Sequence, residues 1–236
     1  MEKSLLIKEN GKIKNYSSFT DKFNIIMMGE EGVGKTDLLK NLSKKKFLNF
    51  KNILIDNDYD KSSNLNLSKK TSNRDIVEKI SLEYTSGDKY YLIKIWNYCY
   101  ISDTNLINDF MKKADAFIIV YSVVDKKSFN NIEKWINEAK NKITSKNIKI
   151  FIIGNNCEKI NDRQVGIDEI KQFAEKDNYK YYEISSFKIK DLENSFNAIF
   201  LDIINTSYSD SEFSELSEEN AKKKGCCSCC KNCNIF

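Results

Sequence analysis

The sequence predicts an α/β fold in which helices cover both faces of a mostly parallel sheet of six strands. Three observations predict it: buried apolar runs alternate with amphipathic segments, a glycine-rich turn follows the first run, and 41% of the 236 residues are hydrophobic. Strands that alternate with helices pair in parallel, because each helix returns the chain to the same end of the sheet. We expect one domain over residues 21–205, between an extension at 1–20 and a tail at 206–236.

Short apolar runs predict the strands, because a strand that is buried on both faces is a continuous hydrophobic stretch. The first run leads into the glycine-rich turn at residues 29–34. A turn at Ser86-Gly87-Asp88 joins the second and third strands. The predicted strands are residues 23–28, 76–84, 89–96, 116–121, 149–153 and 181–184.

Between the predicted strands, apolar residues recur at the spacing of a helix, which predicts helices there. One helix follows the glycine-rich turn from Lys35 to about Leu42, and Ser128, Asp168 and Asp191 are predicted to begin three others. Each of these three presents one apolar face. These faces are Phe129, Ile132, Trp135, Ile136, Ala139 and Ile143; Ile170 and Phe173; and Leu192, Phe196, Ile199, Phe200 and Ile203.

Three segments lie outside this pattern. Residues 44–72 are rich in Lys, Asn and Ser and are too long for an ordinary connection, which predicts an insertion before the second strand. In the extension, Asn10-Gly11 between two alternating runs predicts a hairpin, with a flexible extension as the alternative. In the tail, we expect the acidic stretch at residues 210–219 to be a solvated spacer.

The composition excludes several classes of function. The chain has no His, which removes histidine catalysis and the commonest metal ligand. Its net charge of +4 is small and well mixed, so we expect no nucleic-acid partner. The sequence contains neither a signal-peptide pattern nor an apolar run that could span a bilayer. We therefore expect the cytosolic side of the membrane, with any membrane contact made through a lipid.

Residues 29–36 carry the strongest motif. Their sequence, GEEGVGKT, matches G-x-x-x-x-G-K-[ST], in which backbone N–H groups surround phosphate oxygens at a helix N-terminus. Lys35 is expected to reach the β- and γ-phosphates, and the Thr36 hydroxyl to bind Mg²⁺. The alternative is a glycine-rich turn with a solvated lysine. The predicted phosphate-binding residues are Gly29, Glu30, Glu31, Gly32, Val33, Gly34, Lys35 and Thr36.

A longer stretch resembles the small GTPases of the Ras superfamily and, among them, the Rab family. The resemblance covers residues 22–205 and is clearest at FIIVY (117–121), SFNN (128–131) and IGN (153–155). The sequence FMKKA (110–114) is similar to the family's tract after switch II. The resemblance implies the P-loop small-GTPase fold, with GTP or GDP as the bound nucleotide and Mg²⁺ as the metal.

The resemblance also assigns the guanine-binding residues. The family's N-K-x-D motif, whose carboxylate accepts hydrogen bonds from guanine and whose lysine covers the base, corresponds to NNCE at 155–158. The longer Glu158 side chain and the shorter Asn156 side chain are expected to weaken guanine binding by roughly 10- to 100-fold. The family's S-A-K loop corresponds to SSF at 185–187. The implied residues are Asn155, Asn156, Glu158, Ser185 and Ser186.

Switch II departs furthest from the family, whose W-D-T-A-G-Q-E corresponds to WNYCYIS at 96–102. Asn97 replaces the carboxylate that supports Mg²⁺, Tyr100 replaces the glycine that meets the γ-phosphate, and Ile101 replaces the glutamine that orients water. Glu31 would crowd or repel the phosphate. We therefore expect slow or absent GTP hydrolysis and assign no catalytic residue. The implied metal ligands are Thr36, Asn97 and Thr71, with Ser72 as an alternative to Thr71.

The cysteine-rich end predicts lipid attachment. Cys233 begins a C-a-a-X sequence, and its terminal Phe favours geranylgeranyl. One prenyl chain anchors weakly, so a second signal is needed. Zinc binding by these cysteines is the alternative. The second signals are palmitoylation at Cys226, Cys227, Cys229 and Cys230 and attraction of Lys222, Lys223 and Lys224 to an anionic leaflet.

Two functions fit these motifs. The first is a membrane-anchored guanine-nucleotide switch in vesicle traffic, whose switch regions recruit effectors and which meets an exchange factor and a prenyl-binding chaperone. The second is a pseudo-GTPase, a membrane-tethered interaction module without nucleotide turnover. A P-loop ATPase is a third reading, but it accounts neither for the Rab-like middle of the chain nor for the lipid tail. Both main functions place the protein on the cytoplasmic face of intracellular membranes.

Overall fold

A computed structural model describes residues 5–9, 12–16, 19–44, 50–54, 79–98, 111–143 and 148–224. The chain divides into two compact units, residues 1–197 and 198–236, and each is described by itself. Several predicted residues lie outside the described part of the chain. They are Thr71, Ser72, Tyr100, Ile101, Cys226, Cys227, Cys229, Cys230 and Cys233.

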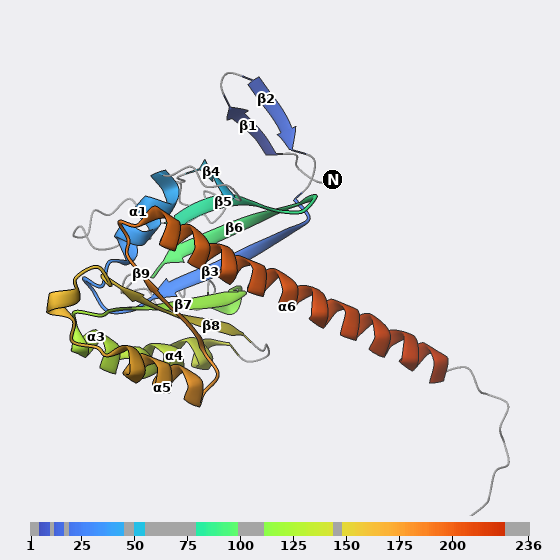
Figure 1. The fold of residues 1–236 in the computed structure, drawn as a ribbon. Coiled ribbons are helices and arrows are strands. Elements are labelled where there is room, and N and C mark those ends of the chain that lie inside the picture. The colour runs from blue at the N-terminus through green and yellow to red at the C-terminus, as the bar shows by residue number, and fades with distance from the viewer. Residues whose placement is uncertain are drawn as a thin grey trace, which may run out of the picture. The chain divides into compact units, whose positions relative to one another are not determined.

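The main sheet has the strand order β4-β5-β6-β3-β7-β8-β9 (Figure 1). β3 pairs in parallel with β6 and β7, and β7, β8 and β9 continue in parallel, whereas β4, β5 and β6 are antiparallel neighbours. The predicted α/β class is confirmed. The strands are β3 (Asp21–Met28), β4 (Phe50–Leu54), β5 (Lys79–Ser86), β6 (Lys89–Asn97), β7 (Ala116–Ser122), β8 (Lys149–Asn155) and β9 (Lys180–Ile184).

All six predicted strands are present, and β4 adds a seventh at the edge of the sheet. β4 lies inside the segment that was predicted as an insertion, and most of that segment lies outside the described residues. The second predicted strand corresponds to β5 (Lys79–Ser86), and its predicted first residues, 76–78, lie outside the described part of the chain.

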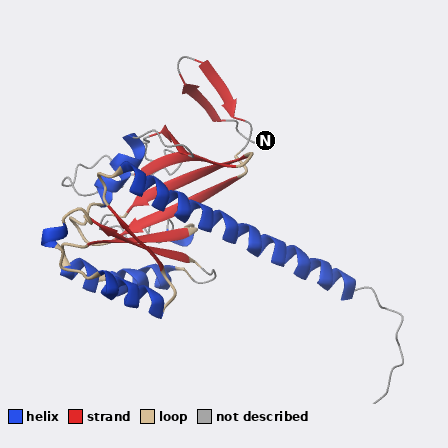
Figure 2. Cartoon of the chain, viewed as in Figure 1, coloured by secondary structure: helices blue, strands red, loops and turns tan. Residues whose placement is uncertain are grey.

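Helices lie on both faces of the sheet (Figure 2). α1 packs beside β4, β5 and β6, α3 and α4 pack against β7, and α5 packs beside β9. Right-handed crossovers that run in opposite directions across the sheet place their helices on opposite faces. The bounds are α1 (Lys35–Lys44), α3 (Lys126–Asn130), α4 (Ile132–Lys142), the 3-10 helix η1 (Ile160–Asp162), α5 (Ile167–Lys176) and α6 (Ile189–Lys224).

The core between β7 and α4 is formed by alternate residues of the strand and by one apolar face of the helix. All seven residues of β7 are buried, and its alternate residues Phe117, Ile119 and Tyr121 share one face of the strand. That face belongs to the same hydrophobic cluster as Trp135 and Ile136 of α4. The predicted apolar face of this helix is therefore confirmed as core.

The predicted helix starts need correction. Asp125 caps α3, since its side chain accepts a 3.0 Å hydrogen bond from the backbone N–H of Lys127. Ser128 lies inside the helix, where its hydroxyl accepts from the Ser122 N–H (3.0 Å) and donates to the Asp125 carbonyl (2.7 Å). Asp168 and Asp191 lie in the first turns of α5 and α6, where a carboxylate favours the positive end of the helix dipole.

α6 continues further than the sequence predicted. It extends to Lys224 and so includes the acidic stretch predicted as a spacer, a segment that lacks the Gly and Pro residues that end helices. In the first unit, Leu192 and Phe196 of this helix are fully buried, and the Tyr84 hydroxyl donates a 2.6 Å hydrogen bond to the Asn197 side chain.

The N-terminal hairpin forms as predicted, and it is separate from the main sheet. β1 (Leu5–Glu9) and β2 (Lys12–Tyr16) pair antiparallel with Glu9 opposite Lys12, which leaves a two-residue connection at Asn10-Gly11. Such a short connection matches the type of turn that Asn-Gly favours.

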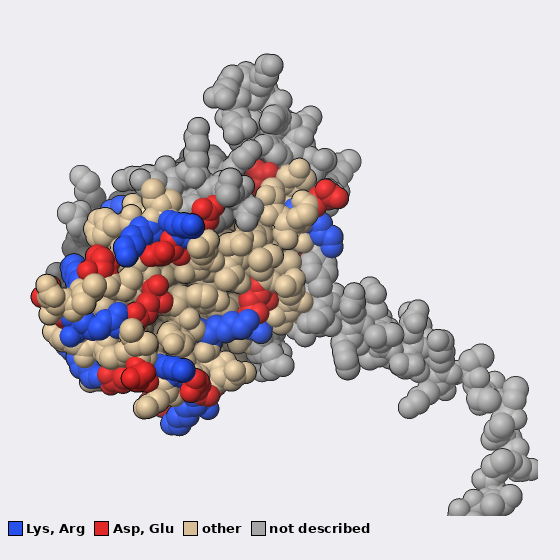
Figure 3. All heavy atoms as spheres, in the orientation of Figure 1, with Lys and Arg blue, Asp and Glu red and all other residues tan. Residues whose placement is uncertain are grey.

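Charges of both signs are interspersed on the face of the molecule in Figure 3, with uncharged side chains between them. This mixture agrees with the small net charge of +4. None of the described helices combines the length and the apolarity needed to span a membrane.

Candidate functional site

The predicted nucleotide-site residues that the structure describes lie at the carboxyl ends of the parallel strands. The parallel strands β3, β6, β8 and β9 end there, with Met27 opposite Asn97 and Asn155 opposite Ile184. β3 lies between β6 and β7. The chain leaves β3 through α1 for the side of the sheet that holds β4, β5 and β6, and it later passes from β6 to β7 on the other side. Open α/β sheets bind their ligands at the carboxyl ends of the strands where the direction of the connections switches in this way.

The glycine-rich loop follows β3 and has little room for side chains. Gly29 has a φ of +143°, and a Cβ added there would lie 2.1 Å from the backbone oxygen of Val120. Gly34 has a φ of +92°, and a Cβ there would lie 2.2 Å from Nδ2 of Asn155. Glycine is therefore required at both positions. α1 begins directly afterwards and presents its N-terminus to the loop.

Lys35 folds back over the loop. Its Nζ donates 2.7 Å hydrogen bonds to the carbonyl oxygens of both Gly29 and Glu30, and the side chain is only 7% exposed. This arrangement excludes a solvated lysine. A buried ammonium at a helix N-terminus is the electrostatic setting that binds phosphate.

Two side chains from distant elements hold the loop in place. Nδ2 of Asn155 donates to the Val33 carbonyl (2.9 Å), and Nδ2 of Asn131 donates to the Glu30 carboxylate (2.9 Å). Glu30 is thereby turned toward α4, whereas Glu31 is exposed on the loop. The predicted interference of Glu31 with phosphate stays a prediction.

The loop after β8 carries a carboxylate that suits a base. Both side-chain oxygens of Glu158 are buried and have no hydrogen-bond partner among the described residues, and the same holds for Oδ1 of Asn155. A buried, unpaired carboxylate is costly without a donor. Guanine offers adjacent ring N–H and amino donors, so these residues fit a guanine nucleotide.

Asn156 does not extend over such a base. Its φ is +65°, and its Nδ2 donates a 2.8 Å hydrogen bond to the Ser122 hydroxyl at the end of β7. The side chain is thereby committed to the sheet. The sequence indicated that Asn156 is shorter than the family's lysine, and the structure shows that its amide contacts Ser122.

The loop after β9 is the third loop at the carboxyl ends of the parallel strands. Ser185 and Ser186 are buried, and Nδ2 of Asn41 in α1 donates to the Ser186 carbonyl (2.7 Å). The Phe187 N–H donates to the Ser185 hydroxyl (3.3 Å), while the Phe187 side chain is 73% exposed. The phosphate loop, the loop after β8 and the loop after β9 therefore form one connected set.

Comparison with known proteins identifies the family. The sequence profile of the Ras family matches residues 24–205, which covers the whole of this site. The chain belongs to the Ras family. Its relatives include "Ras-related protein Rab-11B" from Dictyostelium discoideum, 29% identical over 75% of this chain and 71% of that protein. "Ras-related protein Rab11A" from Lotus japonicus is 24% identical over 78% and 72% respectively, and "GTP-binding protein YPT1" from Saccharomyces cerevisiae is 26% identical over 74% and 75%.

These relatives make the chain a Rab-like small GTPase of the Ras superfamily, and Ras-family GTPases in general bind GTP or GDP with Mg²⁺. The metal residues of this Ras-family protein fit Mg²⁺ poorly. Asn97 is fully buried, and its Nδ2 donates a 3.1 Å hydrogen bond to the Thr36 hydroxyl oxygen, the expected ligand atom. Both groups are neutral, whereas Mg²⁺ is usually bound through carboxylates. Among the described residues, no group of three or more acidic or Cys side chains could hold a metal.

Asn97→Asp is therefore expected to increase the dependence of nucleotide binding on Mg²⁺. We expect the ratio of GDP release rates in EDTA and in Mg²⁺ to rise by at least roughly tenfold, because the new carboxylate accepts from Thr36 and attracts the cation. Stopped-flow release of a fluorescent GDP measures this ratio. Adding Thr36→Ala to the variant should remove the gain, and an unchanged ratio in Asn97→Asp would contradict the role given to Asn97.

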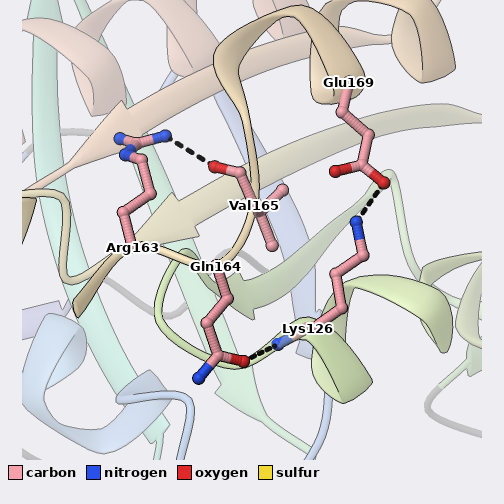
Figure 4. Close-up of polar contacts among 5 residues, drawn as sticks. All are labelled: Lys126, Arg163, Gln164, Val165 and Glu169. Carbon is pink, nitrogen blue, oxygen red and sulfur yellow. Dashed lines mark hydrogen bonds and ion pairs between the residues drawn. The ribbon is translucent and has the colours of Figure 1, made fainter.

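A second group of contacts lies beside the loop that follows β8. Figure 4 shows Lys126 at the start of α3 directed at Glu169 of α5, with which it forms an ion pair, and the Gln164 side chain accepting from the Lys126 N–H (3.1 Å). Arg163 donates to the Val165 carbonyl (3.0 Å). These contacts fix the segment that connects η1 to α5.

Arg163 also pairs with β9. Its two terminal nitrogens donate to the two Glu183 oxygens at 2.9 and 2.6 Å, and the hydrogen-bonded carboxylate raises the pKa of the guanidinium. The sequence motifs predicted no role for Arg163, nor for the contacts of Asn41 and Asn131. One signal was available: Arg163 is one of only two arginines in a chain with 38 basic residues, and a bidentate pair requires arginine.

Proposed function

We propose that this protein binds GTP and GDP at the carboxyl edge of its sheet and acts as a membrane-anchored switch in vesicle traffic, with impaired GTP hydrolysis. The observation that carries the proposal is the carboxylate of Glu158, whose two oxygens are buried and have no hydrogen-bond partner in the part of the chain that the structure describes. It lies in the loop after β8, while Lys35 and the glycine-rich loop supply the phosphate site after β3. A guanine nucleotide has donors for the first and phosphates for the second.

The resemblance to Rab proteins supports the rest of the proposal. Rab proteins act with effectors, exchange factors and prenyl-binding chaperones, and a protein named GTP-binding is among the relatives. Membrane attachment rests on the sequence alone: a prenyl group at Cys233, palmitoyl groups at the four preceding cysteines, and the three lysines at 222–224. Impaired hydrolysis rests on Tyr100, Ile101 and Glu31.

A pseudo-GTPase is the second candidate function, and one contact favours it. The hydrogen bond from Asn97 takes one of the two lone pairs of the Thr36 hydroxyl oxygen, the atom expected to bind Mg²⁺, and brings it an amide in place of a carboxylate. A site that cannot hold Mg²⁺ has less attraction for a triphosphate, so a tethered interaction module without turnover fits this contact.

The nucleotide extracted from the purified protein separates the two functions. We expect chromatography of the denatured protein to release stoichiometric GTP. Bound GTP outlasts purification only when hydrolysis is far slower than the roughly 10⁻⁴ per second of an unassisted small GTPase, which consumes its GTP within hours. Glu158→Ala is the matched control and should be purified without guanine nucleotide. Rapid single-turnover hydrolysis would contradict impaired catalysis. An empty site that also rejects added GTP and GDP would leave the pseudo-GTPase.

A further inference from the structure

Phe187 is a large apolar side chain that the packing of the protein leaves uncovered. Its side chain is 73% exposed, although it directly follows Ser185 and Ser186, which are 0% and 4% exposed. A single exposed aromatic ring is not unusual on a protein surface. Phe187 differs from the other exposed rings because it follows β9 at the carboxyl ends of the parallel strands, where the nucleotide is proposed to bind.

The backbone around Phe187 is held firmly. The Phe187 N–H donates to the Ser185 hydroxyl, and the Lys188 N–H donates to the Ser185 carbonyl at 3.1 Å. The bond from Asn41 to the Ser186 carbonyl ties the same loop to α1. A ring on such a fixed loop loses little conformational freedom when it binds a ligand.

Phe187 is close to the residues that would hold a base. β8 and β9 are parallel neighbours that end with Asn155 opposite Ile184, so the loops that carry Glu158 and Phe187 leave the sheet side by side. Glu158 offers two buried oxygens that lack partners among the described residues, which suit the edge of a base. Asn156 directs its amide at Ser122 instead of covering the face of that base.

We propose that Phe187 stacks on the face of the purine base and so replaces the cover that Asn156 does not provide. This inference rests on the proposed function, since it requires a nucleotide in the site. The flat ring of phenylalanine and the flat purine attract each other through dispersion and the hydrophobic effect. Stacking of an aromatic side chain on a base contributes about 5- to 150-fold in affinity. Phe187 thus strengthens base binding without selecting among purines, while Glu158 selects guanine.

The first test compares affinities for GDP and for inorganic pyrophosphate, measured by calorimetry on the full chain. Phe187→Ala should weaken GDP binding by about 5- to 150-fold and leave pyrophosphate binding unchanged, because pyrophosphate has no base. Phe187→Tyr keeps the ring and should stay within about threefold of the unmodified protein. Ile167→Ala, which removes another exposed side chain at the start of α5, is the control and should change neither affinity.

The second test reports the contact directly. Phe187→Trp should lose tryptophan fluorescence when GDP is added, because stacking on guanine quenches an indole. Tyr90→Trp is the matched control: Tyr90 is also exposed, at the opposite end of β6 from Asn97, and its emission should not respond.

The outcomes separate this inference from the proposed function. Unchanged GDP affinity in Phe187→Ala, or unquenched emission in a Phe187→Trp protein that binds GDP, overturns the stacking role alone. An equal loss of GDP and pyrophosphate affinity in Phe187→Ala also overturns it, since the loop as a whole would then be disturbed. If the unmodified protein binds neither GDP nor GTP, the proposed function fails and the stacking role fails with it.

Discussion

Lys35→Ala is expected to remove nucleotide from the protein. The ammonium is the buried positive charge of the phosphate loop, and its loss leaves the β- and γ-phosphates without their charge-assisted hydrogen bonds. Such bonds contribute about 1.5–3 kcal/mol, so the affinity for GDP and GTP should fall roughly 10- to 150-fold. Equilibrium binding of a fluorescent GDP measures the change, and extraction of the purified variant should yield no nucleotide.

Lys40→Ala is the matched control for this substitution. Lys40 lies on the same helix and is exposed, so the variant loses one positive charge without touching the loop. Its affinity for GDP should stay within about twofold of the unmodified protein. If Lys35→Ala binds GDP as tightly as Lys40→Ala does, the glycine-rich loop is not a phosphate site.

Gly29→Ala is expected to cause the largest loss of stability. The new methyl group would lie 2.1 Å from the Val120 carbonyl oxygen, and neither backbone can move without disturbing the pairing of β3 with β7. The positive φ adds a conformational cost. Together these effects should lower the free energy of unfolding by about 3–6 kcal/mol, or roughly 6–20 °C in Tm.

Gly87→Ala separates the two causes. Gly87 also has a positive φ, +58°, but a Cβ there meets nothing within 4 Å. That variant should lose only about 1 kcal/mol, which is the conformational cost alone. Thermal unfolding and urea titration of both variants give the comparison. Equal losses would show that the contact with Val120 does not restrict residue 29.

The sequence predicted the fold well wherever the hydrophobic pattern is strong. The continuous apolar run at 116–121 became the fully buried β7, and the 3.6-residue period after Phe129 became the apolar face of α4. The strand β4 was missed as a strand, because its FKNIL sequence is short and half polar, and pairing with β5 decides its conformation. The start of α3 was misplaced because Asp125 and Ser128 are both good capping residues.

The site was predicted only as far as local motifs extend. The spacing of the glycines, Lys35 and Thr36 gave the phosphate loop, since that chemistry is contained in eight consecutive residues. The bonds from Asn131 to Glu30 and from Asn156 to Ser122 join residues 101 and 34 positions apart, and they depend on side-chain rotamers that no local pattern encodes. The same is true of the orientation of Asn97 toward Thr36.

The seventh strand, β4, changes which strand edge of the sheet is open to pairing with another protein. β5 pairs with β6 along its whole length, and its residues 81–84 also pair with β4 on the other side, so β4 covers the middle of that second edge. A partner that docks by adding its own strand to a sheet needs a free edge. Such a partner must displace β4 to reach β5 or pair with the outer side of β4 itself. The segment that contains β4, which the sequence predicted as an insertion, therefore decides which backbone edge this GTPase offers to other proteins.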